Sequence, residues 1–229
     1  KIAITMLLPL AGLLALVGNQ DLELTRIRAL QEGSVRLRDA AVNAGNLFDG
    51  QFRRIAQVAD TAAIALQDSG DWTPEEILHF SRAVVTADPL IAGFGSIWEA
   101  GVVPGTETWF MPFALRRDVG LVESDLSARS DQADAMRTFF KQVSEAGRTT
   151  WSSPVAVVGN EGGGREIVRY GVPVITDEKI RGVVVVDIGA MAFRDIAAGI
   201  GLDGGPWLLM DAEGRGIAGQ VDAAVRLVG

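Results

Sequence analysis

Two consecutive apolar segments in the last third of the chain constrain its fold more than any other feature. They cover residues 166–174 and 180–188, and both are rich in β-branched residues. The short turn between them predicts a hairpin of two antiparallel strands. The second segment has Val at four consecutive positions, which favours a strand that is buried on both faces. Asp187 closes this strand, and no catalytic signature lies beside it. The pattern is typical of a sheet that holds a ligand.

The other expected elements are helices and short strands without a β-α-β repeat. Helices are predicted at residues 74–85, 131–146 and 190–198, the first after the capping box Thr73-Pro-Glu-Glu76 and the second before Gly147 as a cap. Strands are predicted at residues 91–99, 107–115, 207–210 and 216–218, and a charged loop at residues 116–129. This order predicts an α+β fold around an antiparallel sheet.

The amino-terminal segment predicts a membrane anchor over residues 1–19. Residues 2–18 carry no charge, and as a helix they would span about 25 Å, a little less than the ~30 Å hydrocarbon core of a bilayer. The alternative is the apolar core of a signal peptide, but no convincing cleavage site follows Leu16. Lys1 favours a cytoplasmic start. The lipid bilayer is therefore the expected partner of residues 2–18, crossed once, with the bulk of the chain outside the cytoplasm.

A long stalk helix is expected to follow the anchor. Residues 20–67 contain no Pro, and apolar residues recur mostly three or four positions apart between Leu37 and Leu66. A continuous helix over these residues would carry the chain about 70 Å from the membrane. It is interpreted as a signal-transmitting stalk, and the alternative is a long core helix with a protruding end. Parallel pairing of two such helices in a homodimer is a further hypothesis.

Composition excludes several classes of function. The net charge of -8 leaves no basic excess to neutralise a nucleic acid. The chain has no Cys and a single His, His79, which excludes thiolate catalysis, Cys-ligated metals and sites built on several His. The Gly run at residues 162–164 lacks the Lys and Ser or Thr of a phosphate-binding loop, so a hairpin turn is expected there. We expect no metal, no cofactor and no enzymatic activity.

Four short motifs occur in a characteristic order: Trp151-x-x-Pro154, Tyr170-x-x-Pro173, Gly182-Val-Val-Val-Val-Asp187-Ile188 and Asp211-x-Glu-Gly214. With the long helix before them, they resemble the Cache family over residues 41–219. This family comprises the PAS-like extracytoplasmic sensor domains of bacterial receptors. The resemblance implies a PAS-like antiparallel sheet flanked by helices, in a protein of the bacterial inner membrane with its domain in the periplasm. In the double-Cache type, residues 68–200 would form the membrane-distal lobe and residues 201–229 the start of an incomplete second lobe.

The resemblance also implies a site for a small carboxylate or amino-acid ligand. In the amino-acid-binding members, an Arg-x-Trp-Tyr run on the pocket helix contacts the ligand carboxylate, and this chain has Arg137-Thr-Phe139-Phe140. Arg137 keeps the planar donors that suit a carboxylate. Because the two polar aromatic residues are replaced, Phe139 and Phe140 either line an apolar pocket or fill a collapsed one. Tyr170 and Asp187 fall where the family holds a ligand amine.

Each candidate ligand contact has an ordinary structural alternative. Arg137 could belong to a solvated or ion-paired helix face. Asp187 could cap the helix that follows it. Tyr170 could be a core residue whose hydroxyl is satisfied. Trp151 is counted as a ligand contact, with a packing anchor as its alternative.

Two functions remain open at the level of sequence. The first is a small-ligand sensor within a bacterial signalling receptor, in which the ligand shifts the long helix and a cytoplasmic output domain. The second is a membrane-anchored accessory subunit of a larger membrane complex, with a Cache-like fold that no longer senses. The replaced ring donors beside Arg137 favour the second function, and the usual occupation of the family favours the first.

Overall fold

The structure is a computed structural model. It describes the backbone of residues 2–67, 72–117, 120–157, 165–176, 178–199, 207–210 and 216–220, with most of their side chains from residue 26 onward. The chain divides into two compact units, Lys1–Phe48 and Asp49–Gly229. The turns expected at residues 162–164 and 211–214, and most of the predicted second lobe, lie outside the described residues.

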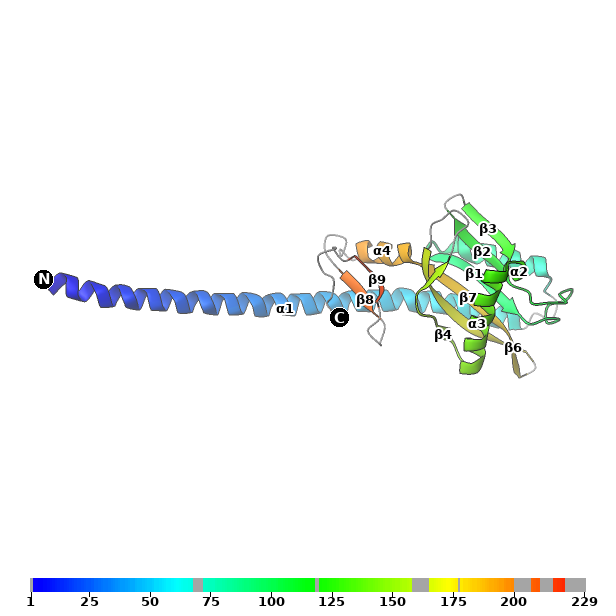
Figure 1. Cartoon of the computed structure of the whole chain (residues 1–229), viewed down its shortest axis with the longest axis horizontal. Helices are drawn as coiled ribbons and strands as arrows, with labels where there is room; N and C mark the ends of the chain where they lie inside the picture. Colours follow the sequence, from blue (N-terminus) through cyan, green and yellow to red (C-terminus); the bar gives the residue numbers. More distant parts are fainter. Residues whose placement is uncertain are drawn as a thin grey trace. The chain divides into compact units, whose positions relative to one another are not determined.

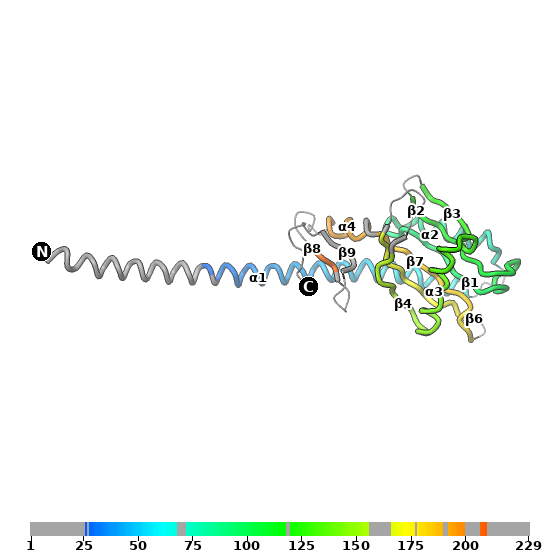
Figure 2. The backbone as a smooth tube through the Cα atoms, in the orientation of Figure 1, coloured from blue at the N-terminus to red at the C-terminus, as the bar shows by residue number. Residues whose placement is uncertain are grey.

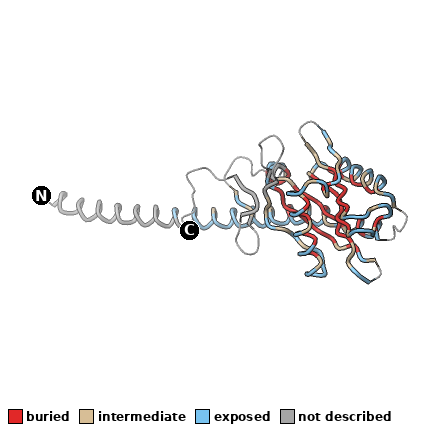
Figure 3. Tube along the Cα trace, turned by 45° about the vertical axis from the view of Figure 1, so that its right-hand side comes forward, coloured by how far each residue is buried: buried red, intermediate tan, exposed pale blue. Residues whose placement is uncertain are grey.

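Helix α1 (Ile2–Gln67) confirms the long helix predicted for residues 20–67. Its described side chains in the first unit are mostly exposed, and they include Leu30 and Leu37, which are 65% and 73% exposed. Figure 3 shows this exposed stretch in pale blue. Where side chains are described, no helix is both long and apolar enough to cross a membrane. The predicted span, residues 2–18, lies outside that part of the chain.

The second unit is built on one antiparallel sheet, whose strands are labelled in Figures 1 and 2. Its strands are β1 (Ile91–Trp98), β2 (Pro112–Arg117), β3 (Gly120–Asp125), β4 (Thr150–Trp151), β5 (Val155–Val157), β6 (Arg165–Thr176) and β7 (Lys179–Gly189). The spatial order is β3-β2-β1-β7-β6-β4, and β5 also pairs with β6. Strands β8 (Trp207–Met210) and β9 (Gly216–Gln220) pair antiparallel in a separate two-stranded sheet. The α+β class and the hairpin of β6 and β7 are confirmed.

The helices of the second unit begin and end where the sequence indicates. Helix α2 (Pro74–Ala87) has the full capping box: the Glu76 N–H donates to Thr73 Oγ1 at 3.3 Å, and the Thr73 N–H donates to Glu76 Oε2 at 2.8 Å. Helix α3 (Ser130–Ala146) ends at Gly147, whose φ of 62° is the left-handed conformation that glycine adopts readily. Helix α4 (Ala190–Gly199) follows β7 directly. All three predicted helices are confirmed.

The register of the strands divides the sheet residues between two faces, because successive side chains of a strand point to opposite sides. Arg169 on β6 lies opposite Asp187 on β7, and both face α3. Tyr170 lies opposite Val186, and both face α1, whose Asp60 accepts a hydrogen bond from Tyr170. We call these sides the α3 face and the α1 face.

Both faces are covered by apolar side chains. The buried residues, red in Figure 3, gather in the strands of the sheet. On the α3 face, the helix packs its apolar stripe onto the sheet, and this cluster contains Ile97, Phe113, Met136, Phe139, Phe140, Val143, Val183 and Val185. In α1, the buried residues of the second unit include Ile55, Ala59, Ala62 and Leu66. Each large apolar side chain that is fully buried contributes about 1.5–3 kcal/mol to folding.

The loop predicted for residues 116–129 is wrong in large part. Strand β3 and a short 3₁₀ helix (Leu126–Ala128) lie there, and β3 pairs with β2 along its whole length. Strand β2 itself begins at Pro112, five residues later than predicted. The alternation of β3 is weak because it is the outermost strand and most of its side chains are partly or fully exposed. An edge strand of this kind resembles a polar loop in sequence.

Candidate functional site

The α3 face carries a buried ion pair at the centre of the sheet. Asp187 is 3% exposed and Arg169 is 6% exposed. The Arg169 Nε donates to Asp187 Oδ1 at 2.7 Å, and its Nη2 donates to Oδ2 at 3.0 Å. This is the two-pronged geometry in which a guanidinium binds a carboxylate most strongly. Asp187 is thus held by a cation of the chain itself, and its role in binding a ligand remains a prediction.

The positive charge of this pair is retained despite its burial. Burial alone would lower the pKa of Arg169, but the charge of Asp187 and its hydrogen bonds raise that pKa above its ordinary value. The Arg169 guanidinium therefore keeps its positive charge throughout the physiological range. The pair satisfies its own charges inside the core, where an unpaired carboxylate would be strongly unfavourable.

Phe139 and Phe140 belong to the core between α3 and the sheet. The Phe139 ring lies over the Arg169 guanidinium, with the guanidinium carbon 5.6 Å from the ring centroid. The Phe140 ring meets Trp109 edge-on, with centroids 5.1 Å apart. Both Phe side chains are more than nine-tenths buried. The sequence left open whether the two rings line an apolar pocket or fill a collapsed one. These contacts favour rings that fill the space beneath α3.

Tyr170 and Trp151 lie on the α1 face, on the other side of the sheet from Asp187. They are partners across β6 and β4, and their ring centroids are 4.5 Å apart. Trp151 also meets Phe52 of α1 edge-on at 5.5 Å. The Tyr170 hydroxyl donates to Asp60 Oδ1 at 3.4 Å. Burial, followed by the charge of Asp60, raises the pKa of Tyr170 above its ordinary value of 10.0.

Arg137 lies on the outer side of α3 and borders an open depression. The depression is lined by Glu99, Trp109, Arg137, Phe140, Lys141, Ser144 and Glu145. The Arg137 side chain is 40% exposed and pairs with Asp134 at 2.8 Å. Such an exposed ion pair contributes little to stability, so another anion can replace Asp134 as the partner of Arg137. Ser144 Oγ, in the wall, is buried without a hydrogen-bond partner.

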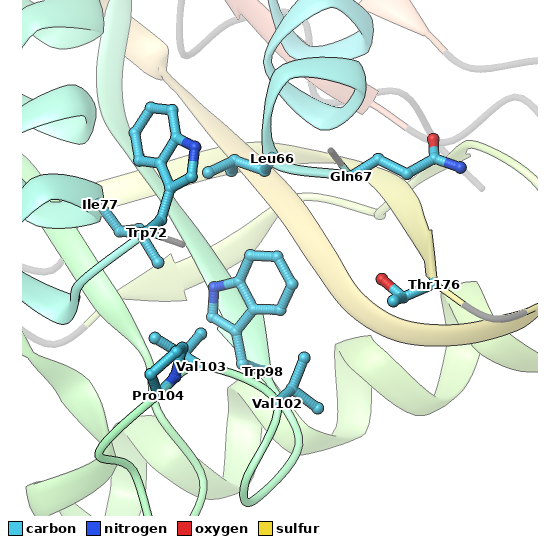
Figure 4. Close-up of a pocket in the computed structure, with 9 residues that line it drawn as sticks. All are labelled: Leu66, Gln67, Trp72, Ile77, Trp98, Val102, Val103, Pro104 and Thr176. Atoms are coloured by element: carbon cyan, nitrogen blue, oxygen red, sulfur yellow. The ribbon is translucent and has the colours of Figure 1, made fainter. Parts of the chain in front are cut away.

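A small apolar cavity of about 50 Å³ lies at another end of the fold. Figure 4 shows the Trp98 ring between Trp72 and Leu66 above and the loop at Val103 below, and Ile77 also lines the cavity. The Trp98 Nε1–H is already bound to Ser96 Oγ at 2.7 Å. Neither this cavity nor the depression beside Arg137 includes Asp187 or Tyr170.

The structure therefore distributes the predicted site residues over three places. Asp187 and Phe139 come together beneath α3, and Phe140 packs in the same core. Tyr170 and Trp151 come together on the opposite face, and Arg137 borders the outer depression. Sequence reasoning missed Arg169, although it stands next to Tyr170 in the hairpin. Its position opposite Asp187 depends on a one-residue register shift between Val174 and Ile175, which the sequence does not signal.

Neither a protein-family model nor a curated protein sequence matches this chain. Among solved structures, the extracellular domain of soHK1S-Z6, described as a histidine kinase, is similar with a TM-score of 0.57 and 18% identity. That match covers 73% of this chain and 64% of the other domain. Methyl-accepting Chemotaxis protein X is similar with a TM-score of 0.58 and 15% identity, covering 78% of this chain and 73% of that one.

The ligand-binding domain of the Campylobacter jejuni chemoreceptor Tlp3, solved in complex with L-valine, is also similar. Its TM-score is 0.55 at 13% identity, and the match covers 81% of this chain and 73% of that domain. At these identities, the likeness establishes the fold alone. The chain has the Cache-like α+β fold found in the extracellular sensor domains of histidine kinases and chemoreceptors, and it spans about two thirds of the first of them.

Proposed function

We propose that this chain is the extracytoplasmic sensor domain of a bacterial signalling receptor and that it has no enzymatic activity. The observation that carries the proposal is the contact of α1 with the sheet. Phe52 and Asp60 of α1 bind Trp151 and Tyr170 on the α1 face. A change in the sheet must therefore change the surroundings of α1. Coupling of this kind is what a receptor needs to shift the balance between two states.

The proposal includes an anchor in the inner membrane. The uncharged residues 2–18 would cross the bilayer once and leave the sheet in the periplasm. Extraction of bacterial membranes at alkaline pH should leave the chain in the pellet. Protease added to spheroplasts should degrade its sheet domain. Release of the chain by alkali, or protection from the protease, would contradict this placement.

The proposed ligand is a small carboxylate, bound in the depression beside α3. Arg137 and Lys141 lie one turn apart at its border, and Trp109 supplies an aromatic wall. Ser144 Oγ offers a buried hydroxyl without a partner. If the ligand is an amino acid, its ammonium group would face Glu99 or Glu145, the acidic residues at the same depression.

A ligand screen tests this proposal directly. Free amino acids and short mono- and dicarboxylates are added to the chain in mild detergent, and the melting temperature is recorded. Arg137→Ala should abolish the saturable shift that the ligand produces in the unchanged protein. Arg148→Ala removes an exposed Arg outside the depression and should keep the shift. A shift that survives Arg137→Ala would place the ligand elsewhere.

A second function, an accessory subunit with a filled site, is favoured by one observation. Arg169 already neutralises Asp187, and Phe139 covers the pair. A sensor fold whose interior is closed in this way can serve as a rigid part of a larger membrane complex. In that case no small ligand shifts the melting temperature, and the chain is recovered with fixed partners from its native membrane.

A further inference from the structure

Asp187 is enclosed on the α3 face by groups of the chain itself. Its neighbours across the sheet are Arg169 on β6 and Gly93 on β1. A Cβ atom at Gly93 would lie 2.8 Å from Leu115 Cδ2, so the Leu115 side chain fills the space that Gly93 leaves. Phe139 lies over the guanidinium. The carboxylate is therefore bound by a cation of β6, Leu115 packs at the neighbouring Gly93 of β1, and Phe139 covers the guanidinium.

The cation is held in place through its own main chain. The Arg169 N–H donates to Ser152 Oγ at 3.0 Å, and the Ser152 N–H donates to the Arg169 carbonyl at 2.8 Å. These two bonds fix Arg169 on β6 between Ser152 and Asp187. Withdrawal of the guanidinium would break the hydrogen bonds to Asp187 and leave both charges buried without partners.

We propose that Arg169 is a built-in cation that occupies Asp187 and closes a cation-binding site on the α3 face. This inference rests on the proposed sensor function and narrows its ligand class: the ligand does not bind through an ammonium group at Asp187. A free amine would have to displace a guanidinium that is tethered beside the carboxylate, and such a tether acts as a very high local concentration. It would also leave the displaced guanidinium without an anion.

Removal of the built-in cation should open the site. Arg169→Ala leaves a buried carboxylate beside a vacancy of the size and shape of a guanidinium. The probe is methylguanidinium, added as its chloride to the full chain in detergent, with sodium chloride at equal ionic strength as the reference. We expect a lower melting temperature for Arg169→Ala, and a saturable recovery with methylguanidinium but not with sodium chloride.

Two controls show whether recovery comes from this site. The double variant Arg169→Ala, Asp187→Asn has no carboxylate there and should not respond. Arg181→Ala removes an exposed Arg of β7 whose partner is Glu99 at 3.3 Å, and it should not respond either. The unchanged protein should show no saturable shift. If Arg169→Ala is unfolded without the probe, recovery of its near-ultraviolet circular dichroism on adding methylguanidinium gives the same answer.

The proposal is overturned if methylguanidinium and sodium chloride act alike on Arg169→Ala, whether that variant is folded or unfolded. It is also overturned if the probe shifts the melting temperature of the unchanged protein saturably and Asp187→Asn abolishes that shift. The assay uses no sensed ligand. Its failure therefore leaves the sensor function standing, and the absence of any carboxylate response at Arg137 would oppose the sensor function alone.

Discussion

Tyr170 and Asp187 lie on adjacent strands of the sheet, yet their side chains point to opposite faces. Tyr170 pairs with Val186, and the residue before it, Arg169, pairs with Asp187. The side chains of two consecutive residues of β6 thus lie on the α3 face and the α1 face of the sheet. Arg169 reaches the core beneath α3, and Tyr170 reaches Asp60 on α1. Strand β6 therefore links the α3 face directly to the long helix.

The contact of Tyr170 with Asp60 can be read by titration, because Tyr170 is the only Tyr in the chain. Its absorbance as tyrosinate should appear above pH 10.0 in the folded protein. Asp60→Asn should lower this pKa, because a neighbouring negative charge disfavours the phenolate. Burial should still keep the value above that of the unfolded chain. An unchanged titration in Asp60→Asn would contradict the contact.

The same shift sets the direction of a pH dependence. The pKa of Tyr170 is raised in the folded state, so the folded protein holds this proton more tightly than the unfolded chain does. The stability due to Tyr170 should be complete below pH 10.0 and should be lost as the pH rises through the folded pKa. Urea unfolding across this range measures the loss, and Tyr170→Phe should remove this component.

The buried ion pair predicts a contrast between single and double substitutions. Asp187→Ala leaves the Arg169 guanidinium unpaired in the core and should cost about 3–5 kcal/mol of unfolding free energy. The double variant Arg169→Met, Asp187→Leu replaces both charges by apolar groups and should be nearly neutral. Urea denaturation measures both. A double variant as unstable as the single one would show that the pair has further structural partners.

Gly171 should be intolerant of a side chain because α3 packs directly onto it. A Cβ atom there would lie 2.7 Å from Phe139 Cε1 and 2.8 Å from Val143 Cγ2. Gly171→Ala should therefore lower the unfolding free energy by about 1–3 kcal/mol. Gly50→Ala is the matched control in α1, where a Cβ atom would meet nothing within 4 Å. It should raise stability by about 0.5–1 kcal/mol, and equal effects would contradict this packing.

The helices were predictable because their signals are local. The capping box at Thr73 and the Gly147 cap each act within a few residues, and the structure has both. The apolar stripe of α3 also follows from local spacing. The pairing of β6 with β7 was predictable as well, since the two segments are adjacent and alike in composition.

The register that brings Arg169 opposite Asp187 was not predictable. Near the turn, Thr176 pairs with Lys179 and Ile175 with Ile180, but an irregularity then shifts the ladder by one residue. Without that shift, Arg169 would pair with Val186. Asp187, the next residue along β7, would then point to the opposite face of the sheet from Arg169. A one-residue change moves every side chain relative to its partner. The sequence contains no strong signal for such a bulge, so the site beneath α3 required the structure.

The exposed apolar residues of α1 predict that two copies of the membrane-anchored chain form a parallel homodimer. Leu30 and Leu37 are exposed and lie seven residues apart, a spacing at which identical residues of two parallel helices face each other. The chain has no Cys, so Leu37→Cys should form a disulfide-linked dimer on oxidation. Asp39→Cys, on the opposite side of the helix, should form much less. Equal yields, or none at either position, would contradict the pairing.

The proposed receptor function is tested most directly by isolating the polypeptide from its native membranes in mild detergent and recording its intact mass and its companions. The account predicts that this sequence belongs to a polypeptide much heavier than 24.3 kDa that carries a cytoplasmic signalling module. A chain near 24.3 kDa, held in fixed proportion within a larger membrane complex, would contradict it and make the domain an accessory subunit.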